Sequence, residues 1–244
     1  MTFKHCRWRI PVLVNLMFLA GVHSGYGNDE AAANPTRPSV SDNAYLTAER
    51  YAEIEIGGLF LDRAWSIPTL LKLGVTADIE VAAAMTGILN YSSSGGTDLG
   101  APGVQAKWQA VSGEWGALAA VGRIDWPNGT GPLYTAYPVL SLRSLPVAID
   151  ATAGAFFSNR SGSYLGSFLY AVALSPKLEG DIGFFVELFG IESSSSSSTG
   201  IDAGVSYGMT PQIVFDVAAN AKISGDAEKW GFQAGFTWTL GRVW

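Results

Sequence analysis

The stretch WGFQAGFTWTL, Trp230 to Leu240, decides the fold, because its side chains alternate with a period of two. Tryptophan, phenylalanine, alanine and leucine occupy the even positions, while glycine, glutamine and threonine occupy the odd ones. A helix would instead bring residues three or four apart onto one face, so this pattern predicts a β-strand with one apolar and one polar face. The preceding stretch, Ile213 to Ile223, sorts its residues in the same way.

The same alternation can be followed backward along the chain as far as Tyr51. Tight turns alternate with longer or more polar connections, such as 90–98 and the serine-rich 191–200, which is typical of a membrane barrel. The predicted strands are roughly as long as the segments of about 9–11 residues that cross a bilayer when tilted. They lie at about 51–60, 66–75, 79–89, 101–111, 117–125, 134–143, 147–157, 164–174, 179–190, 200–208, 212–223 and 229–240.

A sheet in lipid must close on itself, because unpaired backbone groups there cost several kcal/mol each. We therefore predict an all-β fold for residues 51–244, a transmembrane antiparallel up-and-down β-barrel of about 12 strands. The composition agrees, since 48% of the residues are hydrophobic and only 15% are charged. Beyond residue 27 no apolar run approaches the roughly 18 residues of a membrane-spanning helix.

Residues 1–27 have the order of a secretory signal peptide. Lys4, Arg7 and Arg9 precede the apolar stretch Ile10 to Val22, and small residues follow up to Gly27. We expect export and cleavage near Gly27, with an uncleaved anchor as the alternative. Residues 28–50 form a polar N-terminal lead-in, which we expect to be a linker, with a plug inside the lumen as the alternative.

The chemistry left to the exported chain is limited. Cys6, His5 and His23 all lie in residues 1–27, so no thiolate or imidazole remains to act as a nucleophile, a base or a metal ligand. We therefore expect no enzyme activity, no cofactor and no metal. Cleavage removes three of the 15 basic residues and none of the 21 acidic ones, which makes the net charge more negative than −6 and argues against a nucleic-acid partner.

Charged residues share one parity along the predicted strands, which predicts that they line the lumen. Their mixed signs indicate ion pairs across it rather than the single-sign field of an ion-selective pore. Glu53 with Glu55, or Asp181 with Glu187, could also act as an acid–base pair or bind calcium, but solvation of the lumen is the favoured interpretation. The predicted lumen-lining residues are Glu55, Lys72, Glu80, Lys107, Arg123, Asp150, Asp181, Glu187, Asp202, Asp216 and Lys222.

The C-terminal residue, Trp244, shares the parity of Phe236, Trp238 and Leu240. This ending is similar to the aromatic signal that the barrel-assembly machinery recognises, although Arg242 stands where a hydrophobic residue is usual. The expected partners are therefore this machinery and outer-membrane lipid.

Three stretches carry a resemblance to a known family. They are the lead-in PTRPSVSDNAYLTAERYAEIEIG (Pro35 to Gly57), the hairpin LKLGVTADIEVAAA (Leu71 to Ala84) and the close of the chain from Asp202 to Gly241. Together they resemble the bacterial phenol meta-pathway degradation family of outer-membrane transporter-like barrels. The resemblance implies a passive channel or transporter in a Gram-negative outer membrane, for small and possibly hydrophobic or aromatic compounds.

Two alternatives stay open at this point. One is a structural or adhesive outer-membrane barrel with a closed lumen and no transport. The other is a soluble periplasmic β-sandwich, which would have to bury the aromatic face of residues 230–240 against a second sheet.

Overall fold

The computed structural model describes residues 31–160, 163–225 and 228–244. The predicted signal peptide, with Cys6, His5 and His23, lies outside these residues. None of the described residues belongs to a helix that is long and apolar enough to cross a membrane.

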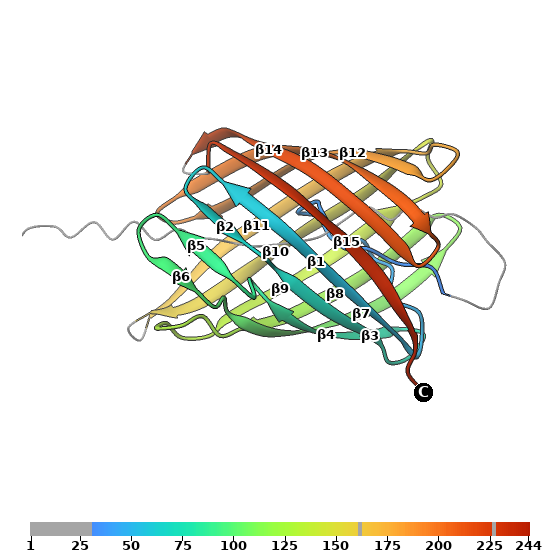
Figure 1. Ribbon diagram of the computed structural model, residues 1–244, viewed down its shortest axis with the longest axis horizontal. Coiled ribbons are helices and arrows are strands. Elements are labelled where there is room, and N and C mark those ends of the chain that lie inside the picture. Colours follow the sequence, from blue (N-terminus) through green and yellow to red (C-terminus); the bar gives the residue numbers. More distant parts are fainter. Residues whose placement is uncertain (1–30, 161–162, 226–227) are drawn as a thin grey trace, which may run out of the picture.

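Within the described residues, twelve strands form one closed wall, as predicted. Strands that are consecutive in this wall pair antiparallel, and the last pairs with the first (Figure 1). The strands are β1 (Tyr51–Leu61), β3 (Thr69–Gly74), β4 (Ile79–Met85), β7 (Pro102–Gly113), β8 (Gly116–Asp125), β9 (Leu133–Leu142), β10 (Val147–Arg160), β11 (Ser163–Pro176), β12 (Ile182–Ser193), β13 (Ser197–Thr210), β14 (Ile213–Gly225) and β15 (Trp230–Arg242).

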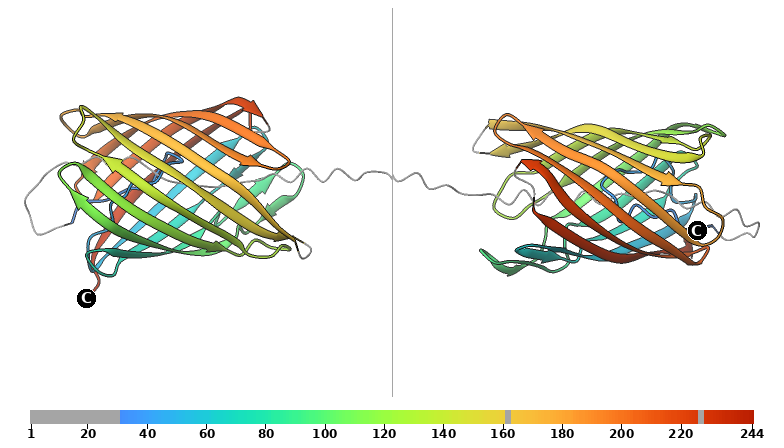
Figure 2. Two further views of the ribbon diagram at one scale, coloured as in Figure 1. Left: turned by 180° about the vertical axis from the view of Figure 1, so that it is seen from behind. Right: turned by 90° about the horizontal axis from the view of Figure 1, so that it is seen from above.

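Three short strands extend the wall at one end of the barrel: β2 (Ala64–Ser66), β5 (Asn90–Ser92) and β6 (Gly96–Asp98). We call this end the loop end, and the opposite end, where the C-terminus lies, the terminal end (Figure 1). The strands run obliquely between the two ends in every view (Figure 2).

The wall closes along the seam between β1 and β15. The two strands pair from Tyr51, which lies opposite Arg242, to Leu61, which lies opposite Gly231. The register has one irregularity, between Ala52 and Glu53. On the outer face the Phe60 and Phe232 rings meet across the seam with centroids 6.5 Å apart. The alternating stretch at residues 230–240 thus becomes the strand that removes the last free edge.

Some predicted boundaries differ from the observed ones. The stretch 90–98, expected to be a loop, contains β5 and β6. The serine-rich stretch 191–200 is mostly strand, because Glu192 pairs with Ser197 and only 194–196 connect β12 to β13. Serine has little intrinsic preference for strands, so the pairing with the neighbouring strand determines its conformation here.

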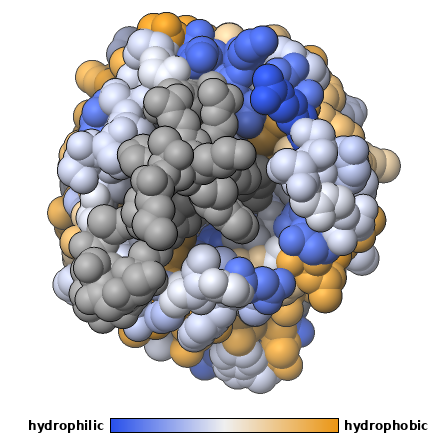
Figure 3. All heavy atoms as spheres, turned by 90° about the vertical axis from the view of Figure 1, so that its left-hand side faces the viewer, coloured by the Kyte–Doolittle hydropathy of each residue, from blue (hydrophilic) through white to orange (hydrophobic). Residues whose placement is uncertain are grey.

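The two faces of the wall differ sharply in polarity. Large apolar side chains on the outward parity stay exposed, including Val186, Leu188, Val217 and Trp238 at 44–50%. Viewed from the loop end, hydrophilic residues gather on the rim and hydrophobic ones on the outer perimeter (Figure 3). Charged residues on the inward parity are buried instead, for example Glu55 and Lys72. This apolar exterior is suited to lipid and excludes the sandwich, in which the apolar face would be covered.

Candidate functional site in the barrel lumen

Residues 33–47, which we call the lumenal segment, lie inside the barrel (blue in Figures 1 and 2). They form neither helix nor strand. Thr36, Arg37, Ser41 and Asp42 are nevertheless fully buried and bonded to strand side chains. The segment is therefore not the external linker that its composition favoured, and its position corresponds to the alternative of a plug.

The first anchor is Lys72 on β3, which forms ion pairs with Glu53 and, at 2.6 Å, with Glu55 on β1. Its ammonium group also donates to the Asn34 carbonyl at 2.5 Å. The two carboxylates accept the backbone N–H groups of Asn34 at 2.7 Å and Thr36 at 2.6 Å. The paired glutamates thus hold the lumenal segment, because Lys72 and these N–H groups occupy their oxygens.

The second anchor is Arg37, which lies against the seam. Its Nε lies 3.3 Å from Asp216 Oδ2 on β14, and both side chains are buried. Gly57 and Gly235 face each other across the seam at this level. A Cβ added at Gly57 would lie 2.0 Å from Arg37 Cζ, and one at Gly235 would lie 2.7 Å from Arg37 Nε. The glycine pair therefore provides the space that the guanidinium occupies.

The third anchor lies on β12 and β15. Glu187 accepts the N–H groups of Val40 and Ser41, each at 2.5 Å. Gln233 donates its amide to the Pro38 carbonyl and, at 3.2 Å, to Asp202. A carboxylate with two backbone N–H donors fixes the chain direction at this turn of the lumenal segment.

The fourth anchor is Lys107 on β7, which donates to Asp42 Oδ1 at 2.7 Å and to the Asn43 carbonyl at 3.0 Å. Burial raises the pKa of Asp42 to about 6, and the positive charge of Lys107 opposes that rise. Further along, the Thr47 N–H donates to Glu80 at 2.7 Å. The anchors thus follow one another along the segment.

Polar groups on and next to β9 and β10 also contact the lumenal segment. The Ala44 N–H donates to Ser141 Oγ at 2.8 Å, and Ser141 in turn donates to Asp150. Arg143 pairs with Asp150 at 2.8 Å, and its guanidinium lies 5.3 Å from the centre of the Tyr45 ring. The hydrogen bonds of the segment thus reach β1, β3, β4, β7, β9, β10, β12, β14 and β15.

Most residues expected to line the lumen are buried on the inward parity. They are Glu55, Lys72, Glu80, Lys107, Asp150, Glu187, Asp202 and Asp216. Arg123 is half-buried and pairs with Asp125 at 2.7 Å. Asp181 and Lys222 differ: Asp181 lies exposed in the turn before β12, and Lys222 is exposed on β14 near the loop end. The prediction for these two residues rested on parity alone. An alternating pattern does not show at which residue a strand leaves the part of the wall that encloses the lumen.

The predicted site residues did not include Asn34, Thr36, Arg37 and Asp42 of the lumenal segment, nor its strand partners Ser141, Thr152 and Gln233. The polarity of the segment is equally typical of a solvated linker, so its composition carried no signal. For Thr152 and Gln233 the alternation indicated the polar face but not the contact with the segment. The described residues include no group of three or more His, Cys, Asp or Glu side chains that could hold a metal ion.

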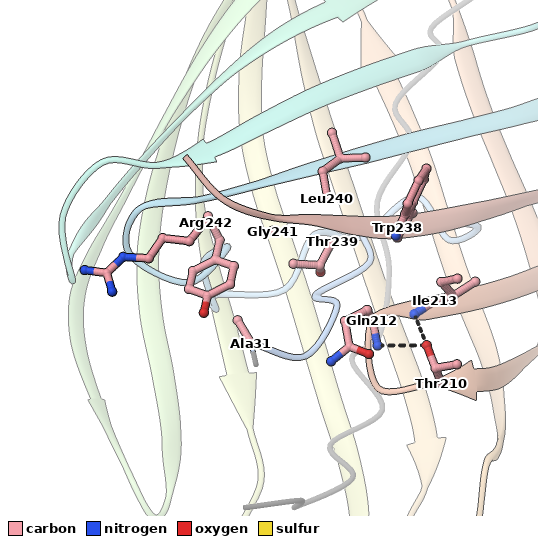
Figure 4. A pocket seen from close by; sticks show the side chains of 10 residues that line it. Ala31, Thr210, Gln212, Ile213, Trp238, Thr239, Leu240, Gly241 and Arg242 are labelled. Atoms are coloured by element: carbon pink, nitrogen blue, oxygen red, sulfur yellow. Dashed lines mark hydrogen bonds between the residues drawn. The ribbon is translucent and has the colours of Figure 1, made fainter. Parts of the chain in front are cut away.

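A cavity of about 370 Å³ lies at the terminal end, beside the entry of the lumenal segment. It is bordered by Ala31, the turn between β13 and β14, and the last residues of β15 (Figure 4). Thr239 lies on the side of β15 that faces Ala31, while Leu240 lies on the other. Thr210 Oγ1 accepts the N–H groups of Gln212 and Ile213 at 3.2 and 3.1 Å, which shapes the turn.

No protein-family model matches this chain, and no curated protein is significantly similar to it in sequence. Solved structures do match. The COG4313 outer membrane channel from Pseudomonas putida F1 has a TM-score of 0.63 at 8% identity, covering 88% of this chain and 100% of that one. The NanC porin gives 0.61 at 11% identity, covering 78% and 100%, and the KdgM porin gives 0.60 at 8%, covering 77% and 99%.

The fold is therefore that of porin-like outer-membrane barrels with twelve strands. The three structures named above are described as porins or channels. Identities of 8–11% establish the fold alone. The function of this chain has to be argued from its own lumen.

Proposed function

We propose that this chain is an outer-membrane channel of a Gram-negative bacterium that passes small solutes passively, with the lumenal segment narrowing the passage. The observation that carries the proposal is a closed wall with an apolar exterior and a charged interior. Its likeness to known porins and channels supports the same conclusion.

The size of the barrel limits the solute. Side chains fill barrels of about eight strands, whereas those of 16 or more leave an open aqueous channel. A twelve-stranded wall stands between these, and here residues 33–47 occupy part of its lumen. Passage then depends on the space between the segment and the wall, which favours small molecules.

The resemblance to the phenol meta-pathway family adds a solute class to the proposal, namely small hydrophobic or aromatic compounds. One part of the inner face favours a hydrophobic or aromatic solute. There β10, β11 and β12 carry Phe156, Leu169 and Phe185 on the inward parity. Apolar side chains facing a lumen have no role in solvating ions, but they do provide contacts for an apolar solute.

A structural or adhesive barrel with a closed lumen is the competing function. It is favoured by the complete burial of Thr36, Arg37, Ser41 and Asn43, which shows that the segment packs tightly at these positions. The two functions make opposite predictions about conductance.

The test is electrical recording in planar bilayers, with liposome swelling as a second readout. The channel function predicts discrete conductance for the exported chain and a larger conductance after deletion of residues 33–47. The closed barrel predicts no conductance and no swelling until the segment is deleted. Each protein is first shown to be folded by its heat-modifiable migration on gels. Equal conductance with and without the segment would contradict the proposed narrowing.

A further inference from the structure

Residues 34–38, near the start of the lumenal segment, contact both sides of the seam between β1 and β15. Their bonds to β1 come from alternate residues. The Asn34 N–H donates to Glu53 at 2.7 Å. The Thr36 N–H donates to Glu55 at 2.6 Å, and the Thr36 hydroxyl donates to the same carboxylate at 2.7 Å. The segment is thereby attached to the first strand of the wall by charge-assisted hydrogen bonds.

The next two residues of the segment are bonded to the other side of the seam. Arg37 pairs with Asp216 on β14, with 3.3 Å between Nε and Oδ2. The Pro38 carbonyl accepts the side-chain amide of Gln233 on β15. Within five residues the segment is therefore bonded to the first strand and to the last two strands, and it connects them from inside the barrel.

The middle of the seam lacks a side-chain pair of its own on the inner face, because Gly57 lies directly opposite Gly235. Side chains paired across strands stabilise a sheet, and glycine offers none. Among the strand pairs of the described wall, the other directly opposed glycines are Gly113 and Gly116, which flank the turn between β7 and β8. The Arg37 guanidinium occupies the space over the seam glycines and so lies against both strands.

The seam also joins the parts of the wall that are most distant in the sequence. Thr239 on β15 donates its hydroxyl to Glu53 on β1 at 3.0 Å, and the two residues are 186 positions apart. Closing so long a loop costs more chain entropy than pairing the consecutive strands of a hairpin. The same Glu53 carboxylate accepts the Asn34 N–H, so the seam and the segment share a hydrogen-bond acceptor. Contacts from the segment to both strands therefore oppose separation where closure is most costly.

We propose that residues 34–38 act as an internal clasp, which holds β1 against β14 and β15 and keeps the barrel closed along its seam. The clasp supplies from the lumen the side-chain contacts that the glycine pair lacks. This role goes beyond narrowing the passage, and it is the same whether the barrel conducts or not. It also makes a specific demand: when the clasp is weakened, the seam should loosen more than the rest of the wall.

The test is hydrogen–deuterium exchange of the exported chain in lipid vesicles, with peptides from β1 and β15 compared with peptides from β10 and β11. R37M removes the bond to β14 and should speed exchange in β1 and β15 by about fivefold or more relative to β10 and β11. T36V removes one hydroxyl that donates to Glu55, so it should act in the same direction by about twofold. T36V keeps the test decisive if R37M does not fold.

D42N is the control within the same segment, because Asp42 bonds to Lys107 on β7 rather than to the strands of the seam. It should leave the exchange of β1 and β15 relative to β10 and β11 as it is in the wild type. The clasp is contradicted if R37M and T36V both leave this ratio unchanged. It is equally contradicted if D42N raises the ratio as much as R37M does.

A covalent link across the seam gives a second test. Phe60 and Phe232 lie opposite each other there on the outer face. In a chain without residues 1–27, and so without the single cysteine of the sequence, F60C and F232C can be joined by a short bifunctional thiol reagent. The link should return the exchange ratio of R37M, or of T36V, to the wild-type value. The matched link between A155C and F168C, opposite each other on β10 and β11, should not, and equal recovery by both links would contradict the clasp.

These measurements also separate the clasp from the proposed function. Exchange does not require conductance, so a chain that shows the expected exchange and conducts nothing would contradict only the channel. A conducting chain whose seam does not respond to R37M or T36V would contradict only the clasp.

Discussion

Arg37 Nε lies 3.3 Å from Asp216 Oδ2, although the two residues are 179 positions apart in the chain. The pair joins the lumenal segment to β14, next to the seam where the first strand meets the last. Because neither side chain is exposed, the interaction is protected from water and salt. The lumenal segment is thereby part of the folded barrel, and changes to it should affect stability as well as passage.

Replacing Arg37 with methionine tests this link. R37M leaves the Asp216 carboxylate buried without its cation, which should cost about 3–5 kcal/mol of unfolding free energy. Urea unfolding from lipid vesicles, followed by tryptophan fluorescence, measures the loss. R63M is the control: the Arg63 side chain is 66% exposed, so its change should stay within about 0.5 kcal/mol. A loss for R37M as small as the control's would contradict the anchoring role.

The glycine pair at the seam gives a second prediction. G57A places a methyl group where the Arg37 guanidinium lies, so it should displace that side chain and cost about 1–3 kcal/mol. Single-channel conductance should rise, because the segment loses one anchor. G122A on β8 is matched to it, since no atom lies within 4 Å of the added carbon. If G57A and G122A have the same unfolding free energy and the same conductance, the space that the glycine pair leaves for Arg37 has no role.

The outer face gives a third prediction. Val217 lies midway along β14 and is 44% exposed on the outward parity. V217R should therefore cost about 2–4 kcal/mol in vesicles, whereas M209R, at the terminal end of β13, should cost about 0–1 kcal/mol. Unfolding from vesicles measures both. A negligible cost for V217R would show that this face does not meet acyl chains.

Asp42 gives a prediction about pH. Its pKa rises from 3.8 to about 6 in the folded chain, so the folded state binds the proton more tightly than the unfolded state. The stability that protonated Asp42 contributes is therefore complete below about pH 4 and is lost as the pH rises through about 6. The unfolding free energy of wild type relative to D42N should be larger at pH 4 than at pH 7. A difference that does not change with pH would contradict this prediction.

Much of the wall could be predicted from the sequence, because strand faces repeat every two residues whatever the tertiary context. Trp230 to Leu240 shows this directly, since its even positions face outward and Gln233 and Thr237 are buried inside. Strand ends were less predictable. The serines at 191–200 and the stretch 90–98 become strands through pairing with neighbours, which no local preference encodes.

The lumenal segment could not be predicted for a different physical reason. A chain that crosses a polar lumen is bonded to charged side chains, so it has the same composition as a chain in water. Nothing near Arg37 in the sequence identifies Asp216, Gly57 and Gly235 as its surroundings. Parity did identify Lys72, Glu187 and Asp202 as inward-facing, but it did not show what they contact.

The most direct test of the account is hydrogen–deuterium exchange of the chain in lipid vesicles, read by mass spectrometry for peptides within residues 33–47. The N–H groups of Thr36, Ser41, Ala44 and Thr47 donate to strand side chains inside the barrel, so they should exchange about as slowly as those of β12 and β14. Exchange within seconds, as in a solvated linker, would contradict the placement of this segment in the lumen.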